Sequence, residues 1–415
     1  MPAGKVIGLG SAGDGIVESD GKRYYVPCCL LNENVEFEPD ETGKRGRLVR
    51  VLSCSKERAE PLCPYFGRCG GCSLQHMSLE TYKSFKLNSF KALFPPDFDF
   101  SCFENPIFVP HGTRRRVTFG VMWNGKMRRF GLNESKSGRI VLVERCILLT
   151  EALERLIVPL RDFFEKAPLS FGTKKGVGDV SVLWADNGAD VLITLPFEAD
   201  LRWRQEVSEI GHQLSIARIS WRRGERDVPE PLFVGRSPVL DVFGFSLKPP
   251  AGAFLQPSRE GERALQDKVR EYVGKSKKVA DLFCGAGTFS LPLLEKKRKI
   301  YGVDTASFSL KALESASEGR IKTECRDLFR TPLFSDELDE YDAVVFDPPR
   351  AGAKAQSEQI ARSSVPVVVA VSCNPSTFAR DAEILLRGGY VMKRLTPVDQ
   401  FIYSPHTELV ALFEK

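Results

Sequence analysis

The fold is decided by residues 279–288, which read Val-Ala-Asp-Leu-Phe-Cys-Gly-Ala-Gly-Thr. An apolar run that ends in spaced glycines is typical of a buried strand that turns beneath a ligand and leads into a helix. Glycines at such a turn let backbone N–H groups approach the ligand closely. Further apolar runs between helical segments predict a doubly wound parallel sheet, with strands at Val279–Phe283, Lys299–Val303, Ala343–Phe346 and Val365–Val371 and a closing antiparallel pair at Tyr390–Leu395 and Glu408–Phe413.

The glycine turn predicts the site of an adenosyl cofactor. Asp304 ends the next strand, nineteen residues after Gly285, where a carboxylate can accept hydrogen bonds from both ribose hydroxyls. A helix N-cap is the alternative role for this residue. No third glycine follows Gly287, although a nicotinamide enzyme needs one for tight helix packing around the pyrophosphate of its cofactor. The motif therefore favours S-adenosylmethionine, which has no phosphates. Asp327, after a further strand, is a candidate for the adenine amine, or else an exposed loop acid.

Two motifs that follow strands carry the predicted chemistry. Residues 347–350 read Asp-Pro-Pro-Arg, and Cys373 follows the next strand, so both belong to the carboxyl edge where open α/β sheets bind ligands. Carbon 5 of uracil accepts a methyl group only after a thiolate attacks carbon 6, and Cys373 is the candidate thiol, with Arg350 placed to lower its pKa. Removal of the carbon 5 proton needs a base. Glu408 is the preferred candidate, and His406 is the second choice. The alternatives are a buried structural cysteine and a surface glutamate.

Residues 1–52 predict a small β-barrel. Asp20-Gly21 separates alternating runs at Gly15–Glu18 and Lys22–Pro27, which is a strong hairpin signal. With strands at Val35–Glu38 and Gly46–Leu52, a five-stranded barrel of OB type fits, and such barrels often bind RNA. A structural appendage is the alternative.

Residues 53–250 predict an α+β domain, and residues 251–415 the catalytic domain. A loop rich in Cys, Gly and Pro runs from Cys54 to Gln75, and Ser78 begins a helix that extends to Phe94 and is a candidate to pack on the catalytic domain. Strands over Arg116–Met122 and Val191–Leu195 and a helix over Glu151–Lys166 follow.

Composition limits the class of protein. A chain of 415 residues is too long for one core, and no apolar run reaches the roughly 20 residues of a membrane helix, so we expect several domains and no membrane partner. The N-terminus lacks a secretory pattern, so the eleven cysteines indicate a reducing compartment, the cytoplasm, with metal-binding or catalytic use. Within a net charge of +5, the clusters Arg114-Arg115-Arg116, Arg128-Arg129 and Arg222-Arg223 favour contact with RNA over a solvated face.

The motifs resemble those of the RNA 5-methyluridine methyltransferases. The matching residues read Asp-Leu-Phe-Cys-Gly-Ala-Gly-Thr-Phe from 281, Asp-Pro-Pro-Arg from 347, Ser-Cys-Asn-Pro-Ser-Thr-Phe-Ala-Arg-Asp from 372 and His-Thr-Glu from 406. The resemblance implies a TRAM-like RNA-binding barrel at the N-terminus, Cys373 as nucleophile, Glu408 as base and Asp347 near both target base and cofactor. It also implies a cofactor site formed by Gln256, Phe283, Gly285, Gly287, Thr288, Asp304, Asp327 and Asp347. The family more often has Asn, Glu and Asn where this chain has Thr288, Asp304 and Asp327.

Four cysteines suit a metal centre. Cys63, Cys69 and Cys72 lie close in sequence, and the distant Cys146 completes four thiolates for zinc or a [4Fe–4S] cluster, with Cys54 as a spare thiol. The spacing is similar to the iron–sulfur branch of the family, which implies [4Fe–4S], with zinc as the alternative.

The expected function is methylation of carbon 5 of a specific uridine in 23S ribosomal RNA by a monomeric enzyme. The same reaction on a transfer RNA uridine, and a catalytically silent RNA-binding protein, are the alternatives. An amino-methyltransferase is disfavoured, since its motif has an aromatic residue in the place of Arg350 and no use for Cys373.

Overall fold

The structure is a computed structural model that describes residues 1–95, 98–125, 127–135, 137–166 and 175–415. The chain forms two compact units. The first comprises Met1–Pro96, Leu132–Ile147 and Phe401–His406, and the second comprises Asp97–Gly131, Leu148–Gln400 and Thr407–Lys415. The domain limits expected from the sequence, at residues 52 and 250, stay a prediction.

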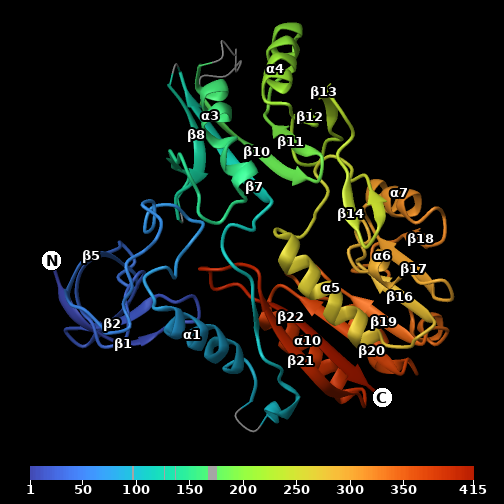
Figure 1. The fold of residues 1–415 in the computed structure, drawn as a ribbon. Helices are drawn as coiled ribbons and strands as arrows, with labels where there is room; N and C mark the ends of the chain where they lie inside the picture. The colour runs from blue at the N-terminus through green and yellow to red at the C-terminus, as the bar shows by residue number, and fades with distance from the viewer. Residues whose placement is uncertain (96–97, 126, 136, 167–174) are drawn as a thin grey trace. The chain divides into compact units, whose positions relative to one another are not determined.

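A five-stranded antiparallel sheet begins the first unit. Its strand order is β3-β2-β1-β4-β5, and Figure 1 shows it curved on itself. The Asp20-Gly21 hairpin is confirmed, since Ser19 pairs with Lys22 and both turn residues have positive φ angles of 49° and 70°. Tyr25 and Arg45 form a single bridge between the two edges, so the sheet is a half-barrel. The strands are β1 (Ala3–Leu9), β2 (Gly15–Ser19), β3 (Lys22–Val26), β4 (Asn34–Pro39) and β5 (Gly46–Ser53).

The sequence patterns did not locate β1, which is the central strand of this sheet. It pairs with β2 on one side and with β4 on the other. Val6 of β1 is fully buried against a small apolar core that includes Val17, Val35 and Phe37. Each barrel-facing residue of β1 alternates with a more exposed one, and two glycines interrupt the apolar pattern.

A buried ion pair joins the half-barrel to the cysteine-rich loop. The Glu33 side chain is inaccessible to solvent, and its carboxylate accepts hydrogen bonds from Nε and Nη2 of Arg58 at 2.6 and 2.7 Å. Burial raises the pKa of Glu33, but the bonds from Arg58 and from backbone N–H groups outweigh it and hold this pKa below its usual range. The predicted helix follows as α1 (Leu79–Lys91), and the Ser78 hydroxyl caps it by accepting from the Thr81 N–H.

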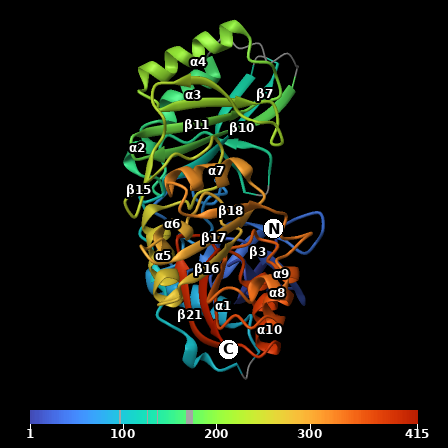
Figure 2. The ribbon, with the colours of Figure 1, turned by 90° about the vertical axis from the view of Figure 1, so that its right-hand side faces the viewer.

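A mixed sheet with helices on one face contributes most of its strands to the second unit. Its order is β13-β12-β11-β10-β7-β8-β9, and only β11 and β12 are parallel neighbours. Helices α3 and α4 lie over the same face (Figure 2), where Phe164 of α3 stacks on Phe130 of β8 and Trp203 of α4 packs beside it. The elements are β7 (Arg116–Asn124), β8 (Met127–Asn133), β9 (Ile140–Val141), β10 (Lys175–Ala185), β11 (Gly188–Thr194), β12 (Arg218–Arg222), β13 (Glu230–Val234) and α4 (Leu201–Gln213).

The helix predicted over Glu151–Lys166 is divided in two. The structure has α2 over Glu151–Glu154 and α3 over Ile157–Lys166. Pro159 explains the break, because it has no N–H to donate to the carbonyl of Arg155, four residues earlier. The prediction of one continuous helix was therefore wrong.

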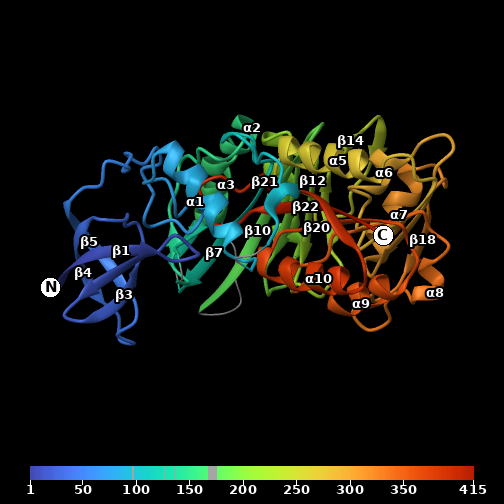
Figure 3. The same ribbon diagram turned by 90° about the horizontal axis from the view of Figure 1, so that it is seen from below.

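The C-terminal sheet has the order β18-β17-β16-β19-β20-β22-β21-β6. Its strands are parallel except that β22 runs antiparallel to both neighbours. Helices α5, α6 and α7 cover one face and α8, α9 and α10 the other (Figures 2 and 3). The strands are β6 (Ile107–Phe108), β16 (Lys278–Leu282), β17 (Lys299–Asp304), β18 (Lys322–Cys325), β19 (Ala343–Phe346), β20 (Val367–Ser372), β21 (Val391–Asp399) and β22 (Glu408–Glu414).

This arrangement confirms the predicted Rossmann-like domain. The chain leaves β16 toward β17 and β18, then returns to the other side of β16 as β19, so the strand order reverses between β16 and β19. Open α/β sheets bind ligands at this switch point. The helices are α5 (Arg259–Val273), α6 (Ser290–Leu293), α7 (Ser307–Ala316), α8 (Ser335–Leu338), α9 (Lys354–Arg362) and α10 (Pro375–Arg387), and β14 (Leu240–Val242) and β15 (Phe245–Leu247) form a separate hairpin.

None of the described helices combines the length and apolar character that a bilayer crossing requires.

Candidate active site

The turn after β16 has the backbone shape that a ligand-binding loop needs. Phe283, Gly285 and Gly287 all have positive φ angles, of 62°, 54° and 92°. A Cβ on Gly287 would lie 2.4 Å from Cδ1 of Leu313, so only glycine fits there. A Cβ on Gly285 would meet nothing within 4 Å, so this side of the turn is open. The two glycines therefore have different physical roles: Gly287 permits close packing against Leu313, and Gly285 leaves one side of the turn accessible to a ligand.

Asp304 holds this turn from the end of β17. Its carboxylate accepts hydrogen bonds from the N–H groups of Gly285 at 2.9 Å and Ala306 at 2.8 Å. Ala306 is itself the N-cap of α7, so Asp304 stabilises the turn before the helix and the predicted alternative, a helix N-cap, was wrong. A carboxylate has about four acceptor positions, so two remain for other donors such as ribose hydroxyls. Ribose binding by Asp304 stays a prediction.

Asp327 is half-buried after β18. Its Oδ1 accepts from the Phe329 N–H at 3.0 Å, and the Phe329 ring lies 5.5 Å from the Phe283 ring. Thr288, also predicted in this site, has its carbonyl bonded by Nε2 of Gln266 at 2.9 Å. These contacts place Asp327 and the glycine turn near one aromatic pair.

The sequence interpretation missed Asp281, a completely buried acid inside β16. Its Oδ2 accepts from the Ser290 hydroxyl at 2.5 Å, and its Oδ1 has no hydrogen-bond partner among the described residues. Burial, with the nearby carboxylates of Asp347 and Asp304, raises the pKa of Asp281 to about 7, against the lowering effect of the Ser290 hydrogen bond. The sequence signal was an acid in an otherwise apolar strand, directly before the glycine turn.

Two loops bring the reactive residues to the carboxyl edge. Asp347 follows β19, and Cys373 follows β20 directly before α10. Nδ2 of Asn374 and Oγ1 of Thr377 both donate to the Arg350 carbonyl, at 2.9 and 3.2 Å, so the two loops are tied together. Strand β22 runs in the opposite direction, so its first residues reach the same edge, where Leu409 pairs with Ser372.

Cys373, Asp347, Glu408 and Arg350 are thereby gathered in one site. Burial, with the carboxyls of Glu408 and Asp347, raises the pKa of the Cys373 thiol to about 11, and the exposed Arg350 opposes this rise. The ligand-free thiol is therefore protonated at neutral pH, and it needs help to act as a nucleophile.

Glu408 is buried and belongs to a chain of hydrogen bonds that the sequence did not reveal. Nε2 of Gln400 donates to Oε1 of Glu408 at 3.1 Å and to Oε1 of Gln256 at 2.8 Å. Burial raises the pKa of Glu408 to about 7, against the lowering effects of Gln400 and Arg350. Burial and the neighbouring Glu408 also raise the pKa of Asp347 well above its usual range. A carboxyl that titrates near neutrality, as Glu408 does, suits proton transfer.

The three adjacent arginines occupy different environments. Arg115 is buried, with Nη2 2.9 Å from Oε2 of Glu262, and its Nε donates to the Gln256 carbonyl at 3.3 Å. Its position supports the segment that carries Gln256 and leaves it no surface for RNA. The guanidinium of the half-buried Arg116 lies 4.6 Å from the ring centre of the exposed Phe254. RNA contact by Arg114, Arg116 and Arg350 stays a prediction.

The cysteine loop in the first unit brings four thiols near one another. The Gly70 N–H donates to the Asn133 carbonyl at 2.9 Å, and the Glu144 N–H donates to the Tyr65 hydroxyl at 3.1 Å, so the segment before Cys146 lies beside the loop. Burial raises the pKa of Cys72 to about 12, and Cys146, Cys69 and Cys63 add to this rise. Among the described residues, however, no three His, Cys, Asp or Glu side chains are grouped as ligands of one metal ion.

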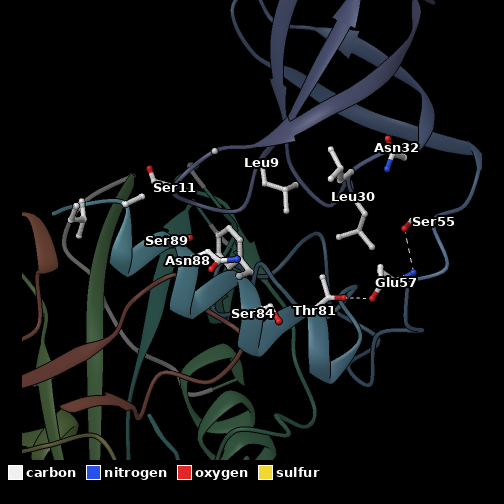
Figure 4. Close-up of a pocket in the computed structure, with 15 residues that line it drawn as sticks. Leu9, Ser11, Leu30, Asn32, Ser55, Glu57, Thr81, Ser84, Asn88 and Ser89 are labelled. Atoms are coloured by element: carbon white, nitrogen blue, oxygen red, sulfur yellow. Dashed lines mark hydrogen bonds between the residues drawn. The ribbon is translucent and has the colours of Figure 1, made fainter. Parts of the chain in front are cut away.

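A pocket of about 590 Å³ lies in the same unit, between the half-barrel and α1 (Figure 4). Leu9 and Leu30 form apolar walls, and Ser84 and Asn88 of α1 point toward it. Its lining includes no Lys or Arg, and its one acidic residue, Glu57, accepts a hydrogen bond from the Thr81 hydroxyl. These neutral walls suit an uncharged group better than a phosphate.

Comparison with known proteins identifies the family. Residues 321–415 match the model of the tRNA (Uracil-5-)-methyltransferases, and residues 259–367 match that of the methyltransferase small domain. An uncharacterized RNA methyltransferase of Agrobacterium fabrum is 37% identical over 426 residues, covering 98% of this chain and 98% of that protein. The chain belongs to the RNA uracil-5-methyltransferase family. The predicted family is confirmed, and with it S-adenosylmethionine as the cofactor.

Two further similarities concern members with named substrates. A 23S rRNA (uracil(1939)-C(5))-methyltransferase of Edwardsiella ictaluri is 29% identical, covering 98% of this chain and 94% of its own. A tRNA (uracil-54, C5)-methyltransferase of Pyrococcus abyssi, solved with S-adenosyl-L-homocysteine, has the same fold, with a TM-score of 0.76 at 22% identity over 99% of each chain.

The pKa of Glu408 generates a prediction about pH. Because burial raises this pKa to about 7, Glu408 is protonated below that pH and cannot accept a proton. We expect kcat/KM for RNA methylation to rise with pH through about 7. Arg350→Met should shift the rise to higher pH, since Arg350 lowers the pKa of Glu408, whereas Arg387→Met, at an exposed arginine of α10, should leave it in place. A profile that is flat between about pH 6 and 8 would contradict the assignment.

Proposed function

We propose that this chain methylates carbon 5 of a specific uridine in 23S ribosomal RNA. One observation carries the proposal: a thiol, Cys373, lies beside the carboxyls of the half-buried Asp347 and the buried Glu408, at the edge of the sheet where the glycine turn follows β16. Uracil-C5 methylation needs a nucleophile and a base beside a methyl donor. The 23S ribosomal RNA substrate of the relative from Edwardsiella ictaluri supports the choice of RNA.

The proposed steps balance as follows. The Cys373 thiol loses its proton to water, with the positive charge of Arg350 stabilising the thiolate, and its sulfur forms a bond to carbon 6 of the uracil. The electron pair of the C5–C6 double bond moves into an enolate, and carbon 5 takes the methyl group. Glu408 then removes the proton from carbon 5, the double bond re-forms, and the C6–S bond breaks to release Cys373.

S-adenosylmethionine, when bound, would supply the methyl group as an electrophile, and its S–CH3 bond would break with the electron pair left on the sulfur of a neutral thioether. We assign its binding to Gln256, Phe283, Gly285, Gly287, Thr288, Asp304, Asp327 and Asp347. The open face of Gly285 and the remaining acceptor positions of Asp304 fit an adenosyl group. Gln256 connects this site to the base through Gln400.

Transfer RNA is the second candidate substrate. The family model that matches the last 95 residues, 321–415, carries a transfer RNA name, and so does the structure from Pyrococcus abyssi. In either case we assign the half-barrel as a TRAM-like RNA-binding module and propose that the enzyme works as a cytoplasmic monomer.

We propose a [4Fe–4S] cluster on Cys63, Cys69, Cys72 and Cys146. The support is that Cys146, Cys69 and Cys63 all raise the pKa of Cys72, so the four thiols lie near one another, as the four thiolates of such a cluster must. The Gly71 N–H donates to the Cys69 sulfur at 3.5 Å, the kind of bond that stabilises a metal-bound thiolate. Zinc is the alternative.

The catalytic assignment predicts covalent complexes. RNA with 5-fluorouridine at the target has no removable proton on carbon 5, so the wild-type enzyme should form a stable adduct on a denaturing gel, and Cys373→Ala should form none. Glu408→Gln should accumulate the methylated adduct with natural RNA. Cys325→Ala, at an exposed cysteine of β18, is the control. Normal turnover by Glu408→Gln would reject Glu408 as the base.

The substrate assignment is tested by mapping 5-methyluridine in total RNA from a strain that lacks this protein. We expect one 23S ribosomal position to lose its methyl group and the purified enzyme to restore it. Loss confined to transfer RNA would replace the ribosomal substrate with the transfer RNA alternative.

The cluster assignment predicts a brown protein when purification excludes oxygen, with about four iron and four sulfide per chain. Cys69→Ser should lose colour and iron, and Cys54→Ser, at an exposed cysteine outside the proposed set, should keep both. A colourless wild-type protein with one zinc per chain would establish the zinc alternative.

A further inference from the structure

The loop that connects the two catalytic strands is held by residues far away in sequence. Residues 401–406 join β21 to β22 and belong to the first unit together with the cysteine loop and α1. The N–H groups of Ser73 and Leu74 both donate to the Tyr403 carbonyl, at 2.8 and 3.1 Å. The Tyr403 N–H in turn donates to the hydroxyl oxygen of Tyr82 in α1, at 3.1 Å. The peptide groups on both sides of Tyr403 are therefore fixed.

Lys86 of α1 fixes the second half of the loop. This lysine is buried, and its ammonium donates to the carbonyls of Ser404, at 3.0 Å, and of His406. The ammonium also lies 5.8 Å from the ring centre of Tyr82. Burying an ammonium costs free energy unless its N–H groups donate hydrogen bonds. If either carbonyl turned away, the buried ammonium of Lys86 would lose an acceptor, which is unfavourable. The loop carbonyls are thus held in one orientation.

The loop backbone is strained where these bonds converge. Tyr403 has a φ of 63°, a left-handed conformation that is unfavourable for a residue other than glycine. Its ring packs on Tyr82, with centres 5.8 Å apart. The surrounding contacts hold Tyr403 in this unfavourable conformation. Such strained residues are typical of loops that position functional groups.

The loop matters because the last ladder pair of the hairpin is Val398 with Glu408. Gln400 lies beyond that pair, directly after the end of β21, and its Nε2 donates to Oε1 of Glu408. The first residue of the loop follows Gln400 directly, and its last residue is two positions before Glu408. The loop is therefore joined through the backbone to both partners of this hydrogen bond.

We propose that Lys86 and Tyr82 are positioning residues for Glu408: with the backbone of Ser73 and Leu74 they hold the loop 401–406, and through it the Gln400–Glu408 hydrogen bond, in the geometry that proton removal needs. The inference rests on the proposed role of Glu408 as the base. The cysteine loop thus has a second role besides any metal group, since Ser73 follows Cys72 directly and its N–H is one of the anchors.

The test uses Lys86→Met in the full-length enzyme, which keeps an aliphatic stem on the helix and removes the ammonium. We expect kcat to fall about tenfold to a hundredfold, as for a base displaced by about an ångström, while KM for RNA and for S-adenosylmethionine stays within about twofold. The fraction of enzyme trapped as the methylated adduct should rise. Lys86→Arg, which retains donors for both carbonyls, should recover part of kcat. Lys83→Met, at an exposed lysine of the same helix, should behave as wild type.

Tyr82→Phe provides an independent variant that removes only a hydroxyl, and it should lower kcat about fivefold with the same adduct accumulation. A lower melting temperature with an unchanged adduct fraction and kcat in both variants would show a merely structural role and overturn the inference. A rise in KM for RNA alone would also overturn it. If Glu408→Gln traps the adduct and Lys86→Met does not, the positioning role of Lys86 is rejected and the role of Glu408 as the base stands. If Glu408→Gln turns over normally, the role of Glu408 as the base is rejected.

Discussion

The parallel pairing of β16, β19 and β20, closed by an antiparallel β22, is the constraint on which the candidate site depends. Parallel neighbours end at the same edge, so the glycine turn, Asp347 and Cys373 are brought together although each follows a different strand. Because β22 runs the other way, it begins where the others end, and its first residue, Glu408, joins them. Reversing that one strand would place Glu408 at the opposite edge.

Burial at this edge sets the protonation states of the reactive groups. Desolvation disfavours the charged forms of Cys373, Asp347 and Glu408, and their mutual repulsion adds to it. Arg350 is a nearby positive charge that opposes this effect, and it is exposed, so its influence is partial. Such a site is less favourable to folding than an apolar one, and perturbed carboxyls and thiols gathered in this way are typical of catalysis.

Hydrogen bonds between residues far apart in sequence fix the backbone segments that carry residues of the candidate site. Arg115 donates to the carbonyl of Gln256, and Lys86 donates to carbonyls of the loop before Glu408. Both are buried cations whose charge-assisted bonds are stronger than neutral ones. In each case a basic residue that charge alone would assign to RNA has a structural task instead. Charge clusters in a sequence therefore overestimate the surface available for a polyanion.

By itself the sequence determined the family, the Rossmann-like sheet and the candidate residues Cys373, Asp347 and Glu408, because short motifs after apolar strands are local and their edge of the sheet follows from strand direction. It did not locate β1, the break before Pro159, the burial of Arg115 or the roles of Asp281, Gln400 and Lys86. These depend on which segments meet in space, and a glycine-interrupted strand or a lone polar residue has no periodic pattern to reveal its neighbours. Only the tertiary structure decided that Gln400 would bond Glu408, since hydrogen-bond partners of buried polar groups are chosen by packing and not by sequence distance.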